Sequence, residues 1–134
     1  MKPFAMESGM LTLRGVFYPT GHLFLMFPGE HEAREAERAL ERSGHSGEHI
    51  SLLTPAEILE KITGTAGAED PLPSPGTEAQ TVRRYTQLAR QGHHGLLIHA
   101  PSHAETEHIM QVLRAHPVSY GQKYRHLVIE DLVA

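Results

Sequence analysis

The chain has 134 residues, with 12 Lys and Arg against 16 Asp and Glu, 11 His and no Cys. This length suits a single domain with one core, and the formal net charge of -4 argues against a nucleic-acid partner, because nucleic-acid-binding domains usually carry a basic face. Without Cys there is no disulfide, no thiolate nucleophile and no Cys-ligated metal, so only His, Asp and Glu remain as metal ligands.

The beginning of the chain carries no apolar run of the kind found in a signal peptide, and no stretch reaches the roughly 18 apolar residues that a membrane span needs. We therefore expect a bacterial, cytoplasmic protein with no membrane partner. Residues 1–8 are expected to be loose.

The first recognisable unit covers residues 22–53. The run "HLFLMFPG" at 22–29 is short, apolar and closed by Pro-Gly, which predicts a strand. Ala33, Ala36 and Leu40 then recur at helical spacing, and "HISLL" at 49–53 predicts a second strand. These residues form the first βαβ half.

Residues 54–94 are expected to be a helical insertion. Thr54 and Glu57 have the spacing of a capping box, which predicts a helix start. A Pro- and Gly-rich linker over 64–76 leads to a further amphipathic helix at 77–91, which should pack on the body of the domain.

A second unit at 95–134 repeats the pattern of the first. When "LLIHAPSHAETEHIMQVL" is set against "LFLMFPGEHEAREAERAL", Pro101 aligns with Pro28, and "YRHLVIEDL" supplies a closing strand. The predicted fold is α+β: a ferredoxin-like duplicated βαβ with an antiparallel or mixed sheet, helices on one face, and the helical segment inserted between the halves.

Both faces of the strands at 22–27 and 95–100 are apolar, whereas helices of the two halves cover only one face. A large apolar face is not normally left in water, so something must cover it. We expect a homodimer that pairs two sheets; the alternative is a monomer in which the inserted helix at 77–91 covers the face.

The candidate site follows from an expected neighbourhood of the first and third core strands. If these strands are parallel, the loops at 28–31 and 100–103 lie side by side. The tentative ligand-binding residues are then Glu30, His31, His99, Ser102 and His103.

Such an edge, with two helix N-termini, suits a small anion, and His99 with His103 suits a divalent metal as an alternative. The simplest alternative is helix-end chemistry without a ligand, because Ser102 and Glu105 form a capping box. In the same parallel arrangement, His22 and His99 would be offset by about four residues, or roughly 13 Å, and would not be partners.

Two stretches resemble the bacterial heat-induced and general stress protein domains. They are "GHLFLMFPGEHEAREAERALERSG" at 21–44 and "RRYTQLARQGHHGLLIHAPSHAETEHIMQVLRAHP" at 83–117. The resemblance implies the fold and a bacterial origin. It implies no catalytic residue.

No catalytic signature is present: the chain lacks a Gly-x-Ser-x-Gly elbow, a phosphate loop and a dinucleotide fingerprint. The leading hypothesis is a non-enzymatic stress-related or regulatory domain, without a resident cofactor, that acts as a homodimer and binds a protein partner or small anion. Enzymatic activity is left open. The alternatives are a His-rich metal-binding protein or small metal-dependent enzyme, and a His-based pH-responsive assembly.

Overall fold

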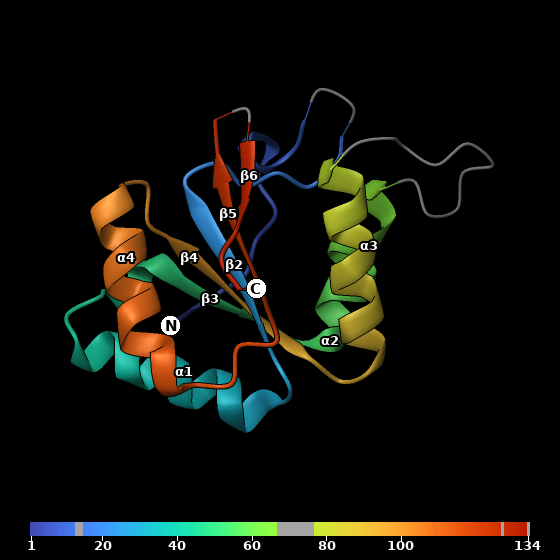
Figure 1. Cartoon of the computed structure of the whole chain (residues 1–134). Helices are drawn as coiled ribbons and strands as arrows, with labels where there is room; N and C mark the ends of the chain where they lie inside the picture. The colour runs from blue at the N-terminus through green and yellow to red at the C-terminus, as the bar shows by residue number, and fades with distance from the viewer. Residues whose placement is uncertain (13–14, 67–76, 127, 134) are drawn as a thin grey trace.

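A computed structural model of the chain describes residues 1–12, 15–66, 77–126 and 128–133. The described residues form one mixed sheet with helices on both faces (Figure 1). Its strands are β1 (Lys2–Pro3), β2 (His22–Phe27), β3 (Ile50–Leu53), β4 (His94–His99), β5 (Tyr120–Arg125) and β6 (Val128–Asp131). The helices are α1 (Glu30–Arg42), α2 (Pro55–Glu57), α3 (Thr77–Arg90) and α4 (His103–Val112). Most of the predicted linker, residues 67–76, lies outside the described residues.

The strand order is β1-β3-β4-β2-β5-β6. β1 and β3 are parallel, and every other neighbouring pair is antiparallel. The predicted α+β class with a mixed sheet is therefore confirmed. Within the described helices, no segment combines the length and the apolar character that a membrane crossing requires.

The expected parallel pairing of the first and third core strands, β2 and β4, is wrong. The crossover through α1 makes β2 and β3 run in the same direction and leaves room for one strand between them. β4 fills that place in the opposite direction, so its start pairs with the end of β2. In this register Phe27 lies opposite His94, and His22 lies opposite His99. The C-terminal ends of β2 and β4 therefore lie at opposite ends of the sheet.

The sheet buries one layer of side chains on each face. Alternate side chains of β2 point to opposite faces, and both sets are apolar. Leu23 and Leu25 belong to the core beneath α1 and α4, where Ile109 of α4 joins them. Phe24 and Met26 point the other way, toward the inserted segment. This alternation is the reason that the run 22–27 reads as continuously apolar.

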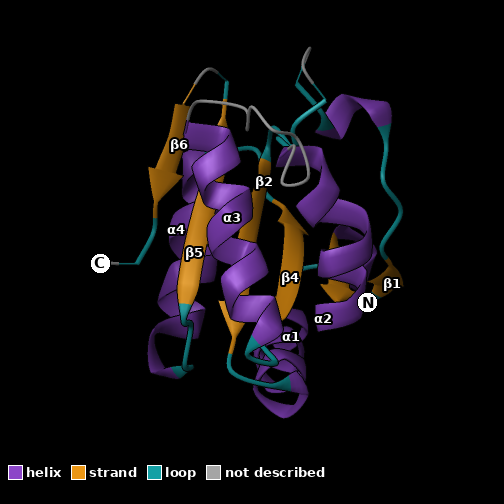
Figure 2. Cartoon of the chain, turned by 90° about the vertical axis from the view of Figure 1, so that its right-hand side faces the viewer, coloured by secondary structure: helices purple, strands orange, loops and turns teal. Residues whose placement is uncertain are grey.

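The helix α3 covers the second face of the sheet. Figure 2 shows α3 lying across β5 and β2, and Val82 and Tyr85 enter the same core as Phe24. The chain continues from α2 through a π-helical turn at Ile58–Ile62 and a 3₁₀ turn at Thr63–Ala66, which also pack on α3. The inserted helix therefore covers this face, as the alternative expected, and leaves no room on it for the pairing of two subunits. A homodimer through another surface stays a prediction.

The N-terminal segment closes the end of the second face that α3 leaves open. β1 pairs with Ser51 and Leu52 of β3, and Phe4 enters the core with only 6% of its surface exposed. Residues 1–8 are therefore placed against the sheet rather than loose. Burial of the Phe4 ring offers a physical reason, since its transfer from water is favourable.

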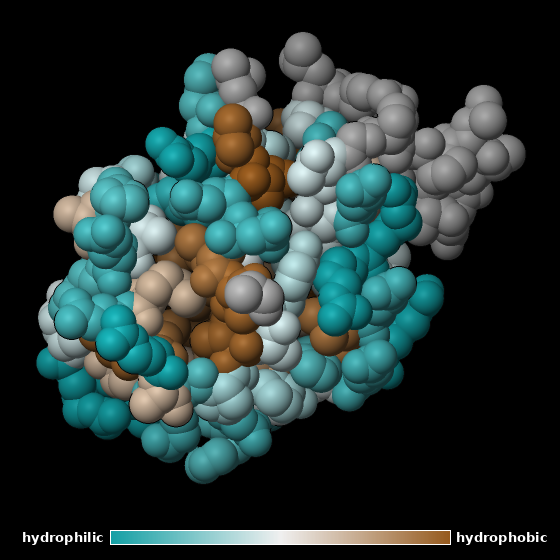
Figure 3. Space-filling view, viewed as in Figure 1, coloured by the Kyte–Doolittle hydropathy of each residue, from teal (hydrophilic) through white to brown (hydrophobic). Residues whose placement is uncertain are grey.

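Apolar surface remains visible between α4 and the sheet. Figure 3 shows brown residues in a hollow at this place. Met110 of α4 and Leu132 after β6 line a depression there. Both side chains are only partly buried against the core beneath α4.

Candidate functional site

The structure separates the residues that the sequence analysis had grouped. Glu30 lies in the first turn of α1, where its carboxylate accepts a hydrogen bond from Arg34 Nε at 2.7 Å, and His31 is exposed beside it. The segment 99–103 lies at the other end of the β2–β4 ladder. Glu30 and His31 therefore lie at the opposite end of the sheet from His99 and His103.

Ser102 caps α4. Its hydroxyl accepts a hydrogen bond from the Glu105 backbone amide at 3.1 Å, and the Glu105 carboxylate accepts one from the Ser102 backbone amide at 3.3 Å. The predicted capping box is present, and this is helix-end chemistry that needs no ligand.

His99 and His103 have different neighbours. His99 lies opposite His22 across the ladder, with ring centroids 4.9 Å apart, so the expectation that these two histidines are not partners is wrong. The reason is again the antiparallel register. His103 instead lies 3.1 Å from the Glu107 carboxylate on α4. Across the described ranges, no group of three or more His, Asp or Glu side chains is placed to hold a metal ion.

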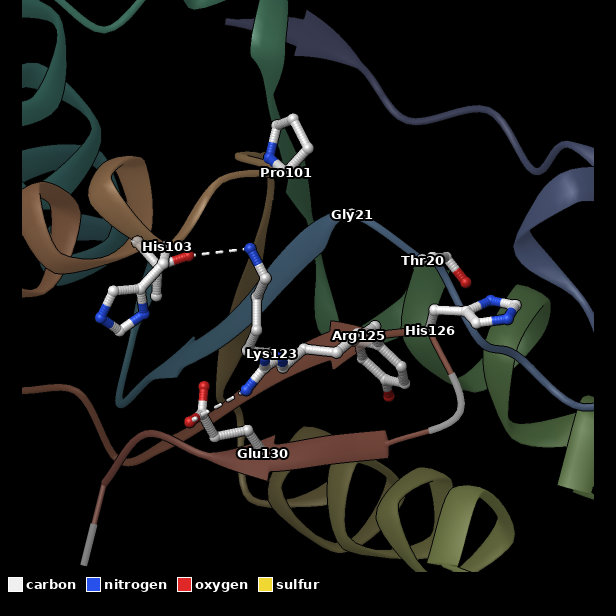
Figure 4. Close-up of a pocket in the computed structure, with 10 residues that line it drawn as sticks. Thr20, Gly21, Pro101, His103, Lys123, Arg125, His126 and Glu130 are labelled. Atoms are coloured by element: carbon white, nitrogen blue, oxygen red, sulfur yellow. Dashed lines mark hydrogen bonds and ion pairs between the residues drawn. The ribbon is translucent and has the colours of Figure 1, made fainter.

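The neighbourhood of His103 contains a cavity of about 310 Å³. The cavity lies between the start of α4, the turn before β2, and the hairpin of β5 and β6 (Figure 4). Its lining residues are Thr20, Gly21, Pro101, His103, Thr106, Lys123, Tyr124, Arg125, His126 and Glu130.

Lys123 forms the floor of this cavity. Its side chain points from β5 toward α4, and only 4% of the residue is exposed. Its ammonium donates hydrogen bonds to the Ala100 carbonyl and, at 2.8 Å, to the Thr106 hydroxyl. An ammonium has three N–H donors, so one is left over for another acceptor.

Burial lowers the pKa of Lys123, while the carboxylates of Glu105 and Glu130 act in the opposite direction. Burying a charged group is costly unless it is well paired. A buried ionisable group with a perturbed pKa beside a cavity is a common sign of a functional site.

The remaining charges at the cavity are also mostly positive. Arg125 lies 3.9 Å from Glu130, which is the single carboxylate in the described lining. His103 and His126 add two imidazoles to the lining. Among the lining residues the permanent charges are thus two cations against one anion, with the carboxylate of Glu105 acting on Lys123 from outside the lining.

Sequence reasoning missed Lys123 because it began the closing strand at Tyr124, four residues after β5 begins and one residue after Lys123. The predicted run "YRHLVIEDL" is in fact divided between β5 and β6. A signal was available in the alternation of "YGQKYR": Lys123 has the same parity as Gly121, which packs against Leu25 in the core.

Comparisons of the chain with protein-family models, with curated proteins and with solved structures found no match. The cavity and its charges therefore provide the basis for a functional proposal.

Proposed function

We propose that the chain is a non-enzymatic regulatory domain that binds a small anion in the Lys123 cavity. The observation that carries the proposal is the buried ammonium of Lys123, which lies under a cavity whose permanent charges are mainly positive. An anion would accept the remaining N–H of Lys123 and offset part of the cost of burying its charge.

Arg125 is the second group that would hold the anion. Its contact with Glu130 is long, at 3.9 Å, and its side chain is 59% exposed, so this ion pair stabilises the fold little. The guanidinium is free to turn toward a carboxylate or phosphate, which it binds through two parallel hydrogen bonds. The volume of about 310 Å³ suits a small metabolite-sized anion.

The lining favours binding over catalysis. Among the residues described at this cavity, no hydrogen bond joins a nucleophilic hydroxyl to a His base. A stress-related role is part of the same proposal, and its support is the resemblance of residues 21–44 and 83–117 to bacterial stress protein domains.

A ferredoxin-like duplication is the finer architecture that we propose for the fold. The four central strands follow the order β3-β4-β2-β5, and α1 and α4 lie together on one face. In this spatial order β4 of the second half lies between β3 and β2 of the first, and β2 lies between β4 and β5 of the second. The same alternation is found in a ferredoxin-like sheet.

A homodimer also belongs to the proposal, through a surface different from the one first expected. Its support is the apolar depression at Met110 and Leu132 between α4 and the sheet. Sedimentation velocity of the wild type and of Met110→Lys tests this point: we expect a dimer that the substitution dissociates. A monomeric wild type would contradict the dimer.

Calorimetric titration with succinate and with inorganic phosphate tests the anion site. The titration is made at about pH 8, where the permanent charges of Lys123 and Arg125 are the ones under test. We expect Arg125→Gln to weaken binding about tenfold, which corresponds to about 1.4 kcal/mol, and Lys123→Met to abolish it. Arg42→Gln, an exposed change at the end of α1, is the matched control and should bind as the wild type does.

Two results would contradict the proposal. One is the failure of both anions to bind at millimolar concentration. The other is binding that persists unchanged in Arg125→Gln. Since Arg125 is exposed and its loss should leave the fold intact, the second result does not depend on the stability of Lys123→Met.

A further inference from the structure

A second cavity, of about 160 Å³, lies on the opposite face of the same end of the sheet. Its outer wall is the N-terminal segment, and its inner wall is made by the ends of β2, β3 and β4. The polar residues that line it are Lys2, Glu7, His22, His49, Ser51 and His99.

Strand parity explains why the imidazoles gather there. His22 has the parity of Phe24, and His99 has the parity of Leu97, and both apolar residues belong to the core beneath α3. Ser51 lies opposite Leu97 in the register of β3 and β4. These side chains therefore share the second face, at the end that the N-terminal segment covers.

The histidines form a continuous row. Ring centroids are 4.9 Å apart between His22 and His99, 5.4 Å apart between His99 and His49, and 5.9 Å apart between His49 and His45. The Nδ1 of His22 lies 3.0 Å from the Thr20 carbonyl, so Nδ1 donates and Nε2 is left as the second ring nitrogen. His49 and His99 are exposed, which leaves a path from solvent.

Burial and the neighbouring imidazoles oppose the protonation of His22 and His45. Burial lowers the pKa of His22, and His99 and Lys2 lower it further, while hydrogen bonds to backbone carbonyls raise it. Burial also lowers the pKa of His45, with His49 and His108 acting in the same direction and Glu105 against them.

The charged groups facing the row come from every packed element. They are Lys2 of β1, Glu7 of the segment that follows, Glu105 and His108 of α4, and His45 after α1. Of these groups, Lys2 and Glu7 line the cavity, and their opposite charges balance. Each proton that the row takes up therefore adds an unbalanced positive charge to the cavity.

We propose that this cavity is an acid-dependent site for a small tetrahedral oxyanion, held by His22, His49, His99 and Lys2. The volume of about 160 Å³ leaves room for one sulfate- or phosphate-sized ion. Protonated imidazoles donate from both nitrogens, so each added proton supplies a donor as well as a charge. The site shares no lining residue with the Lys123 cavity and does not rest on its function.

Sulfate is the probe of choice because it stays doubly charged from about pH 5.5 to pH 8, whereas phosphate titrates in this range. Binding is measured by calorimetry at both pH values, in buffers of different ionisation enthalpy so that proton uptake is counted. We expect sulfate to bind at least about tenfold more tightly at pH 5.5, with uptake of protons from the buffer.

Variants locate the binding. His99→Gln, at the centre of the row, should remove most of the gain in affinity at pH 5.5. His31→Gln, which changes an exposed histidine on α1, is the matched control and should leave the gain intact. Arg125→Gln should also keep the gain, because it changes only the Lys123 cavity.

Three results would overturn this proposal: equal affinity at the two pH values, a gain that survives in His99→Gln, or a gain that disappears in Arg125→Gln. NMR signals of the histidine rings give a second readout. At pH 5.5, sulfate should shift the ring signals of His22, His49 and His99 and leave those of His31 unchanged; the reverse pattern would also overturn the site. The proposal for the Lys123 cavity is tested separately. It is rejected if no anion binding at about pH 8 depends on Arg125.

Discussion

His22 and His99 are direct cross-strand partners, and their imidazoles meet at the point where β2 begins and β4 ends. Antiparallel neighbours of this kind bring side chains close enough to influence one another's charge. The pair therefore connects the stability of the central ladder to pH.

Acidification should destabilise the chain through His22. Burial lowers the pKa of His22 in the folded state, so the unfolded chain, with a pKa of about 6.5, binds the proton more tightly. The stabilisation is therefore complete above about pH 7 and is lost as the pH falls through 6.5 toward the lowered value. In sulfate-free buffer, urea unfolding should show a smaller free energy of unfolding at pH 5.5 than at pH 7.5.

The control for this prediction is a pair of glutamine variants. His22→Gln should reduce the loss between the two pH values, whereas His31→Gln should leave it unchanged. An equal loss in His22→Gln and the wild type would show that another group dominates the pH dependence.

Tyr85 and Tyr124 form a buried pair of phenols whose oxygens lie 2.8 Å apart. Both side chains are fully buried, and the bond between them gives each hydroxyl a partner, one as donor and the other as acceptor. Tyr85→Phe or Tyr124→Phe alone leaves one hydroxyl without its partner and should cost about 1–3 kcal/mol. The double variant should cost clearly less than the sum of the two, and a double-mutant cycle by urea unfolding measures the difference. Additive losses would mean that the two hydroxyls are not coupled.

Gly95 is required by the close approach of Phe24. A Cβ at Gly95 would lie 2.6 Å from Cζ of Phe24. The Phe24 ring has no room to move because it is fully buried and packs on Tyr85, with centroids 4.3 Å apart. Gly95→Ala should therefore destabilise the fold by about 1–3 kcal/mol. Gly9→Ala, where a Cβ meets nothing within 4 Å, is the control and should change the midpoint of unfolding little; equal effects would contradict this explanation.

Lys123→Met should lower stability moderately as well as abolish anion binding. The substitution removes the donor that the Ala100 carbonyl and the Thr106 hydroxyl share, and it also removes the cost of burying a charge. With these effects opposed, we expect a loss of about 1–2 kcal/mol in urea unfolding. A variant more stable than the wild type would show that the buried charge costs more than its hydrogen bonds contribute.

Local features were predictable from the sequence because their causes are local. The capping boxes of Thr54 with Glu57 and of Ser102 with Glu105 depend on residues three apart, and the structure contains both. The apolar run that became β2 and the spacing that became α1 are of the same kind. Each is fixed by neighbours within a few positions.

Pairing across the sheet was not predictable in the same way. The direction of β4 beside β2 depends on which gap α1 leaves in the sheet, and nothing near His99 in sequence indicates that it will face His22. Lys123 was missed for a related reason: its burial comes from α4, which precedes it in the chain and folds back over it. Both errors concern contacts between distant segments.

Strands from the two halves of the chain alternate across the centre of the sheet, in the order β3-β4-β2-β5. Each of the three ladders among these strands therefore joins one half to the other, and the ladder that lies within a single half is the β5–β6 hairpin at the margin of the sheet. In a nascent first half, β3 can pair only with the short strand β1, and β2 has no partner until β4 has emerged. Folding must close long loops before any central pair forms, which slows the reaction and makes it all-or-none.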